Sequence, residues 1–220
     1  MLTLPGPAGP LAALLDLPAA DRGTHAALFC HPHPQYGGTM HSKVVYRIAR
    51  AARDLGIPTL RFNFRGAGGS AGAFDDGRGE AEDARAALDF LGQRFPGREL
   101  IAGGYSFGSW VALRVGADDD RVTTLVAIGF PTTVFGTEVV RAIAKPALVV
   151  QGGADRLGPI AELEAALAES PAGAAGRTRV TSIDGAEHLF TGHELEVYAA
   201  VREFLAEHIL GPTAGSIASP

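Results

Sequence analysis

Short apolar runs recur along the chain, and most of them are nearly continuous rather than interleaved with polar residues. Runs of this kind are typical of strands buried on both faces, which occur in parallel sheets covered by helices. The pattern predicts strands at residues 25–30, 58–64, 99–105, 122–130, 146–153 and 179–184. Two further runs, at 1–6 and 10–18, are expected to form a short antiparallel pair at one edge.

Segments with helical periodicity lie between these runs. Val44, Ile48 and Leu55 fall on one face of the segment 41–56, where Gly56 supplies a stop signal. Comparable patterns predict helices within 79–97, 158–170 and 193–210. Strands that alternate with helices in this way predict a doubly wound α/β fold, with a mostly parallel sheet and helices on both faces. We expect one domain over residues 1–210 and a flexible tail over 211–220.

The composition narrows the functional classes. Hydrophobic residues make up 46% of the chain and charged residues 20%, which is typical of a globular protein. The net charge of −5 is mixed along the chain, without the basic stripe of a nucleic-acid-binding protein or the polybasic run of a membrane-binding one. No apolar run is long enough for a membrane span. The single cysteine, Cys30, excludes an internal disulfide and favours the cytoplasm, where we expect a monomer or a small homo-oligomer.

Residues 104–108 read GYSFG, a G-x-S-x-G motif. With 29 glycines in the chain the motif alone is weak, because an ordinary glycine-rich turn could produce it. Its position is more informative, since it lies between the expected strand 99–105 and a helical pattern that begins at Phe107. A turn there raises Ser106 above the carboxyl ends of the strands, where open α/β sheets bind ligands. This setting favours a nucleophile elbow with Ser106 as the nucleophile.

A serine nucleophile needs a base, and the base needs a group that holds its orientation. Asp155 follows the expected strand 146–153, and His188 follows the expected strand 179–184. The order Ser106, Asp155, His188, each after its own strand, is the order expected of one particular fold. The three residues therefore form the candidate catalytic set.

Each partner also has a simpler interpretation. Asp155 could cap a helix that begins near Pro159. Asp184 and Glu187 are closer to His188 in sequence and are rival orienting acids, although their shared loop makes the far nitrogen of the histidine awkward to reach.

These stretches resemble the α/β-hydrolase fold, and specifically the small lidless hydrolases related to dienelactone hydrolases. The resemblance is carried over most of residues 25–190 by "CHPHPQYGGTMHSKVV", "RFNFRGAGGSAGAFDDGRGEAEDARAALDFL", "GGYSFGSW", "QGGADRLGP" and "DGAEHLF". It implies that Ser106 is the nucleophile, His188 the general base and acid, and Asp155 the orienting carboxylate. One position departs from the family pattern: Asn63 stands where many members carry an aspartate.

The resemblance also implies an oxyanion hole made of two backbone N–H groups. Phe107 provides one of them, because it opens a helix and its amide has no partner there. The loop after strand 25–30 provides the other, from Gln35 or else Tyr36, with His33 still open; Pro34 has no N–H.

Two other motifs point to different chemistry. His31, His33 and His41 could bind a metal, but two of them alternate faces if the strand continues. Residues 66–71 mimic a dinucleotide fingerprint, yet a true one opens a helix at once, and here none can begin until about Gly79. We therefore expect neither a metal nor a cofactor.

The remaining predictions concern the substrate. Residues 131–145 are too short for a cap domain, so the site is expected to be open to water. One histidine and several aromatic side chains, which could equally belong to the core, are candidates for the pocket lining: His33, Tyr36, Trp110, Phe130, Phe135 and Phe190. The sequence predicts a serine hydrolase that cleaves carboxylic esters or thioesters of small to medium acyl groups through an acyl-enzyme. The alternatives are acyl transfer or perhydrolysis on the same residues, a peptidase, or a binding protein without catalysis.

Overall fold

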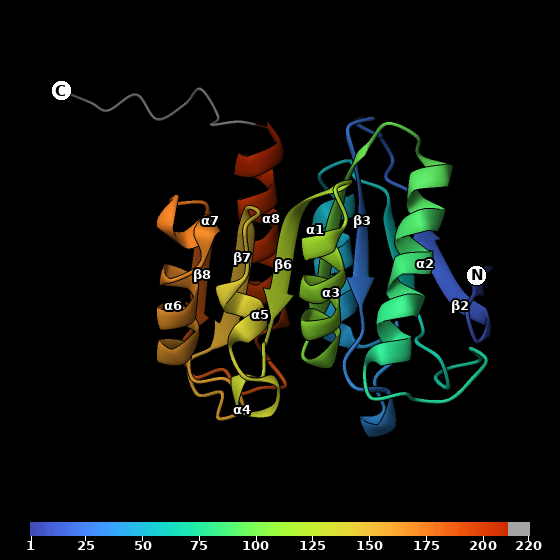
Figure 1. The fold of residues 1–220 in the computed structure, drawn as a ribbon. Coiled ribbons are helices and arrows are strands. Elements are labelled where there is room, and N and C mark those ends of the chain that lie inside the picture. The colour runs from blue at the N-terminus through green and yellow to red at the C-terminus, as the bar shows by residue number, and fades with distance from the viewer. Residues whose placement is uncertain (211–220) are drawn as a thin grey trace.

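Eight strands form one sheet in a computed structural model, which describes residues 1–210 (Figure 1). They are β1 Leu2–Gly6, β2 Gly9–Asp16, β3 His25–Cys30, β4 Thr59–Phe62, β5 Glu99–Tyr105, β6 Val122–Ile128, β7 Ala147–Gly152 and β8 Thr178–Ile183. Their order across the sheet is β1-β2-β4-β3-β5-β6-β7-β8. Strands β3 to β8 are parallel, and β1 and β2 add the predicted antiparallel edge. The tail predicted at 211–220 lies outside the described residues.

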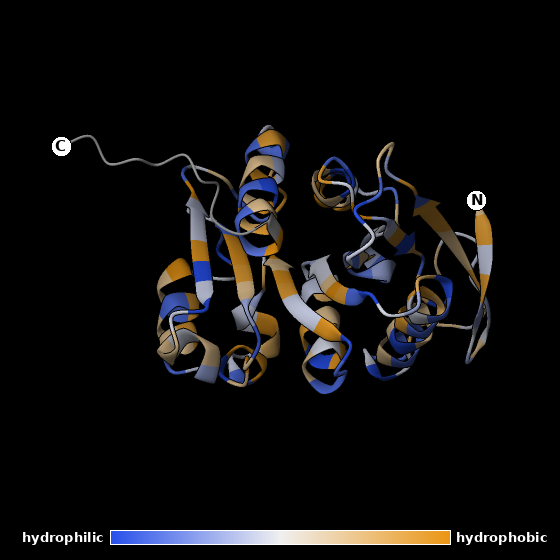
Figure 2. Ribbon diagram, turned by 90° about the horizontal axis from the view of Figure 1, so that it is seen from above, coloured by the Kyte–Doolittle hydropathy of each residue, from blue (hydrophilic) through white to orange (hydrophobic). Residues whose placement is uncertain are grey.

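Helices cover both faces of the sheet, which confirms the doubly wound fold (Figure 2). Helices α1 and α8 pack on one face, and α2, α3, α5 and α6 pack on the other. The long helices are α1 Lys43–Arg53, α2 Arg78–Arg94, α3 Phe107–Asp118, α6 Ile160–Ala168 and α8 Glu194–Leu210. Short helices follow at α4 Thr132–Phe135, α5 Glu138–Arg141 and α7 Pro171–Ala174, with a 3-10 turn, η1, at Pro34–Tyr36.

Strand β5 explains why the apolar runs are continuous. Its side chains alternate between the two faces, so that Leu100 and Ala102 enter the core beneath α2 and α3 while Ile101 enters the core beneath α1 and α8. Both faces of the strand are therefore shielded from water. Glu99, the first residue, is exposed, and the residues after it are buried and apolar or glycine. The same arrangement brings the carboxyl ends of the parallel strands to one edge, at the bottom of Figure 1.

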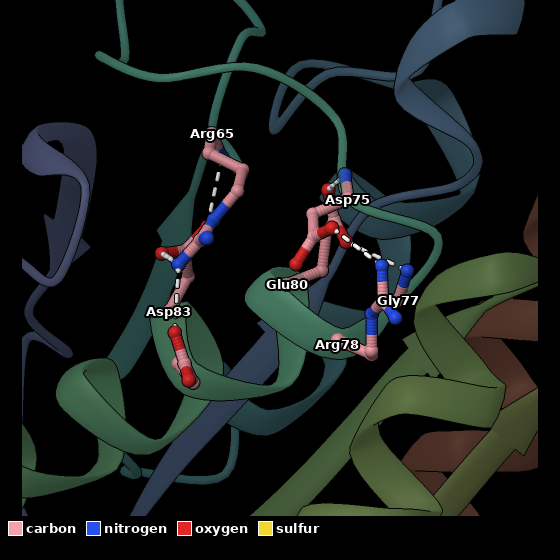
Figure 3. A network of polar contacts seen from close by, with 7 residues as sticks. Arg65, Asp75, Gly77, Arg78, Glu80 and Asp83 are labelled. Carbon is pink, nitrogen blue, oxygen red and sulfur yellow. Dashed lines mark hydrogen bonds and ion pairs between the residues drawn. The ribbon is translucent and has the colours of Figure 1, made fainter.

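The glycine-rich segment between β4 and α2 is held by buried charged side chains (Figure 3). The Arg65 guanidinium pairs with Asp83, with Nε 3.0 Å from Oδ2 and Nη2 2.9 Å from Oδ1. The fully buried Glu80 carboxylate accepts hydrogen bonds from the N–H groups of Asp75 (3.0 Å) and Gly77 (2.8 Å). A carboxylate thus already occupies the helix N-terminus that a phosphate would need, which argues against the dinucleotide interpretation.

Asn63 has a role that an aspartate could not fill. Its Oδ1 accepts a hydrogen bond from the N–H of Met40 at 2.8 Å, and its Nδ2 donates to the carbonyl of Gly68 at 2.8 Å. An aspartate could make the first contact but has no N–H for the second. These two contacts explain why asparagine stands at position 63, where many family members carry an aspartate.

No helix within residues 1–210 combines the length and the apolar character needed to cross a membrane.

Candidate active site

Ser106 occupies a strained turn between β5 and α3. Its backbone has φ 54° and ψ −122°, a conformation that non-glycine residues rarely adopt and that costs about 1–3 kcal/mol. The Ser106 N–H donates to the carbonyl of Ile128 at 2.9 Å, which ties the turn to the end of β6. The side chain is held above the carboxyl ends of the strands, as the elbow prediction requires.

The two glycines of the motif are required by close packing. A Cβ added to Gly104 would collide with the carbonyl oxygen of Gly108. A Cβ added to Gly108 would collide with the carbonyl oxygens of Cys30 and His31, at the end of β3. The first turn of α3 therefore lies directly against the backbone of its own strand and of the neighbouring strand. Only glycine at both positions allows the elbow to form.

The structure brings Ser106, His188 and Asp155 together from the ends of three strands. Ser106 Oγ lies 2.9 Å from His188 Nε2, and His188 Nδ1 lies 2.8 Å from Asp155 Oδ2. Because an ionised carboxylate only accepts hydrogen bonds, Nδ1 carries the proton and Nε2 is free to accept the serine hydroxyl proton. The geometry is that of a nucleophile, a base and an orienting acid.

Asp155 is buried and fully hydrogen-bonded. Besides the histidine, its Oδ2 accepts Nε2–H of Gln151 at 2.7 Å, and its Oδ1 accepts the N–H of Leu157 at 2.8 Å. The cap of α6 is Pro159, so Asp155 does not cap that helix. Two donors besides the histidine thus hold the carboxylate in its orientation.

The rival acids do not take this place. Asp184 and Glu187 are exposed, and among the described residues neither forms a hydrogen bond to His188.

Gln151 and Tyr105 contribute to the site although the sequence did not single them out. The Gln151 amide is fully buried, donates to Asp155 and to the carbonyl of Gly158 (2.9 Å), and accepts the N–H of Phe130 (2.9 Å). Its signal in the sequence was a lone amide within an apolar strand.

The Tyr105 hydroxyl donates to the carbonyl of His188 at 2.8 Å, and burial raises the pKa of this phenol, which keeps the donor protonated. In the sequence, this role is indicated by a tyrosine, with its polar hydroxyl, at the end of the strand directly before the serine.

His31 fastens the loop after β3 through both ring nitrogens. Its Nδ1–H donates to the carbonyl of Pro32 at 2.6 Å, and its Nε2 accepts the N–H of Phe64 at 2.9 Å. No nitrogen is left for a metal, and within the described residues no group of three or more histidine, cysteine or acidic side chains is placed to hold one. Burial lowers the pKa of His31 to about 4, so the ring is neutral.

The neutral His31 predicts a loss of stability in mild acid. The unfolded histidine takes up a proton near pH 6.5 while the folded one resists it, so the unfolded state binds more protons between the two pKa values. The free energy of unfolding is expected to fall by about 2 kcal/mol between pH 7.5 and pH 5 through this residue. Urea unfolding at both pH values measures it. His31→Gln should lose this part of the pH dependence and the exposed His41→Gln should keep it; equal slopes in both variants would contradict the assignment.

The loop amides fall into two groups. Gln35 N–H donates to His33 Nδ1 at 3.3 Å, and Tyr36 N–H donates to the His33 carbonyl at 3.1 Å, so the turn η1 uses both of the predicted donors. The N–H of His33 itself makes no hydrogen bond within the described residues. Phe107 begins α3, and its N–H has no acceptor within the helix. Of these three loop amides, only that of His33 is left without an acceptor among the described residues.

A cavity of about 240 Å³ lies beside the Ser106 side chain. It is lined by Pro32, His33, Tyr36, Tyr105, Ser106, Phe107, Pro131, Val134, Phe135, Leu157, His188 and Leu189. A larger surface depression, of about 840 Å³, is lined by residues 17–22 and 53–56, near the amino ends of β3 and β4 and away from the serine.

Three of the six predicted pocket residues line the cavity, and three do not. His33, Tyr36 and Phe135 line the cavity. Phe130 and Phe190 do not, because both are fully buried in the core, on opposite faces of the sheet. Trp110 also lies behind the cavity, where it stacks on Phe135 with ring centroids 4.4 Å apart.

Comparison with known proteins agrees with the fold. A family model described as an alpha/beta hydrolase domain matches residues 26–199. An uncharacterized protein of Rickettsia prowazekii is 35% identical in an alignment of 187 residues that covers 81% of this chain and 77% of that protein. An alpha-beta serine hydrolase homologue from Coxiella burnetii is 32% identical with a TM-score of 0.84, over 93% of this chain and 96% of that one.

A serine hydrolase without a lid from Xanthomonas campestris is 33% identical with a TM-score of 0.79, over 94% of this chain and 93% of that one. In the present structure, too, the described segment between β6 and β7 holds only the short helices α4 and α5, so no cap domain is inserted there. The narrower relation to dienelactone hydrolases stays a prediction. Fold, strand-end site and family model agree, and the chain belongs to the alpha/beta hydrolase family.

Proposed function

We propose that this protein hydrolyses carboxylic esters or thioesters of small to medium acyl groups, through an acyl-enzyme formed on Ser106. The observation that carries the proposal is the hydrogen-bonded chain from Ser106 Oγ through His188 to Asp155, at the wall of an apolar cavity. The single, buried Cys30 agrees with a cytoplasmic enzyme, and no cofactor is needed for this chemistry.

The first half of the reaction acylates the serine. As Oγ attacks the carbonyl carbon, His188 Nε2 takes the hydroxyl proton, and Asp155 stabilises the imidazolium without being protonated. The negative charge on the carbonyl oxygen is held by the N–H groups of Phe107 and His33, each worth about 3–4 kcal/mol in comparable enzymes. His188 then gives its proton to the leaving oxygen or sulfur as the bond to the acyl carbon breaks.

The second half repeats these steps with water. His188 takes a proton from a water molecule, whose oxygen attacks the acyl carbon, and the bond to Ser106 Oγ breaks as the serine regains its proton. The open mouth of the cavity, without a cap domain, favours water as the acceptor over a second bound substrate. Hydrolysis is therefore proposed over acyl transfer.

A pre-steady-state assay with p-nitrophenyl acetate and butyrate tests the proposal. We expect a burst of p-nitrophenol equal in amount to the enzyme, and labelling by a fluorophosphonate that peptide mapping places on Ser106. A folded protein that gives neither burst nor label would overturn the proposal in favour of a binding protein of the same fold. Faster product formation with added alcohol, at unchanged acid release, would favour acyl transfer.

A further inference from the structure

Four exposed apolar side chains surround the mouth of the Ser106 cavity. Tyr36 is 87% exposed, Val134 60%, Leu157 42% and Leu189 69%, and all four line the cavity. We call these four residues the apolar collar. They follow four different strands, β3, β6, β7 and β8, so they are far apart in sequence and meet only at this edge of the sheet.

Single exposed apolar residues are ordinary on a protein surface, but a convergent group is not. The other large hydrophobic residues that are exposed in the described chain do not line this cavity: Met1, Leu17, Tyr46 and Leu195. An exposed side chain in the segment that follows each of four strands gains little from the core beneath it. The convergence points to a ligand that covers the collar.

The cavity inside the collar carries no fixed charge. Its lining contains no lysine, arginine, aspartate or glutamate, and its titratable side chains are His33, Tyr36, Tyr105 and His188. Burial lowers the pKa of His33, which favours the neutral ring. An anionic group on the ligand would therefore lose its hydration here without gaining a cation.

The size of the cavity determines where a longer ligand must go. Its volume of about 240 Å³ is smaller than the roughly 300–1,000 Å³ typical of pockets for drug-sized ligands. The part of an acyl chain that exceeds this volume, with the carbonyl at Ser106, has to pass through the mouth and lie against Leu157 and Leu189. The collar would then shield from water the part that the cavity cannot hold.

We propose that the apolar collar binds the acyl chain of an uncharged, medium-chain ester and so sets the chain-length preference of the enzyme. The proposal rests on the esterase function proposed above and narrows its substrate class. Binding of a second copy of the chain to the collar, or a preference for a charged acyl group, would contradict this proposal.

The test compares p-nitrophenyl esters from acetate to hexanoate, with kcat/KM as the readout. We expect kcat/KM to rise about fourfold for each added methylene, since burial of one methylene is worth about that factor. In Leu189→Ser the value for hexanoate should fall about tenfold and that for acetate less than about twofold. The matched control is Leu17→Ser, an exposed leucine by the distant depression, which should leave the profile unchanged.

A charged probe tests the second part of the proposal. The mono-p-nitrophenyl ester of adipic acid has the same six-carbon chain as the hexanoate but ends in a carboxylate. We expect its kcat/KM, corrected for spontaneous hydrolysis, to be at least about tenfold lower. Equal values for the two esters would overturn the preference for uncharged chains.

Three other outcomes would overturn the role of the collar. They are a profile that peaks at acetate, an equal loss at all chain lengths in Leu189→Ser, and a change from dimer to monomer in that variant. If no ester is turned over, the proposed function fails separately, and the collar is still tested by calorimetry. Ser106→Ala should then bind p-nitrophenyl hexanoate about tenfold more tightly than the double variant Ser106→Ala/Leu189→Ser; equal affinities would overturn it.

Discussion

Replacing Ser106 with alanine is expected to lower kcat for p-nitrophenyl butyrate by about a millionfold, to the level left by binding and the oxyanion hole. The variant keeps the Cβ atom, so the strained backbone at φ 54° is neither relieved nor made worse. His188 loses the hydroxyl 2.9 Å from Nε2 and has no other nucleophile to activate except water. Steady-state turnover and the absence of a burst measure the effect.

The matched control is Ser182→Ala, which removes the hydroxyl of an exposed serine on β8. It should retain wild-type turnover. Circular dichroism and urea unfolding check that Ser106→Ala is folded. If that folded variant kept its activity within tenfold of the wild type, the nucleophile would have to be another residue or a water molecule.

The parts of the fold that follow from local pattern could be predicted from the sequence. Strands buried on both faces give continuous apolar runs, as β5 does, and the short segment at 131–145 leaves no room for a cap domain. The succession Ser106, Asp155, His188 could be proposed because parallel strands bring their carboxyl ends to one edge. That these three residues meet follows from the order and direction of the strands alone, which the alternation of strands and helices already indicates.

The details that depend on side-chain direction could not be predicted. Phe190 has a positive φ of 52°, which turns its ring into the core instead of the cavity, and no pattern in the sequence reports such a turn. The choice between His33, Gln35 and Tyr36 depends on which amides the turn η1 uses internally. Gln151 reaches Asp155 from four residues away, a contact that exists only once the loop after β7 has closed.

Asp155→Asn is expected to lower kcat by about four powers of ten while leaving KM nearly unchanged. The carboxylate now accepts His188 Nδ1–H and Gln151 Nε2–H on one oxygen and the Leu157 N–H on the other. An amide has one oxygen, so one side of residue 155 must present N–H groups to other donors. If that side faces His188, the ring takes the opposite tautomer, with its proton on Nε2, and cannot accept the proton of Ser106.

The rival acids supply the controls for this prediction. Asp184→Asn and Glu187→Gln remove exposed carboxylates that form no hydrogen bond to the histidine within the described residues, so both should keep turnover within about twofold. If Asp155→Asn changed kcat only a few-fold while Glu187→Gln abolished turnover, Glu187 would be the orienting acid. The buried Asp155 would then serve only to tie Gln151 and Leu157 together, and its replacement would lower stability rather than activity.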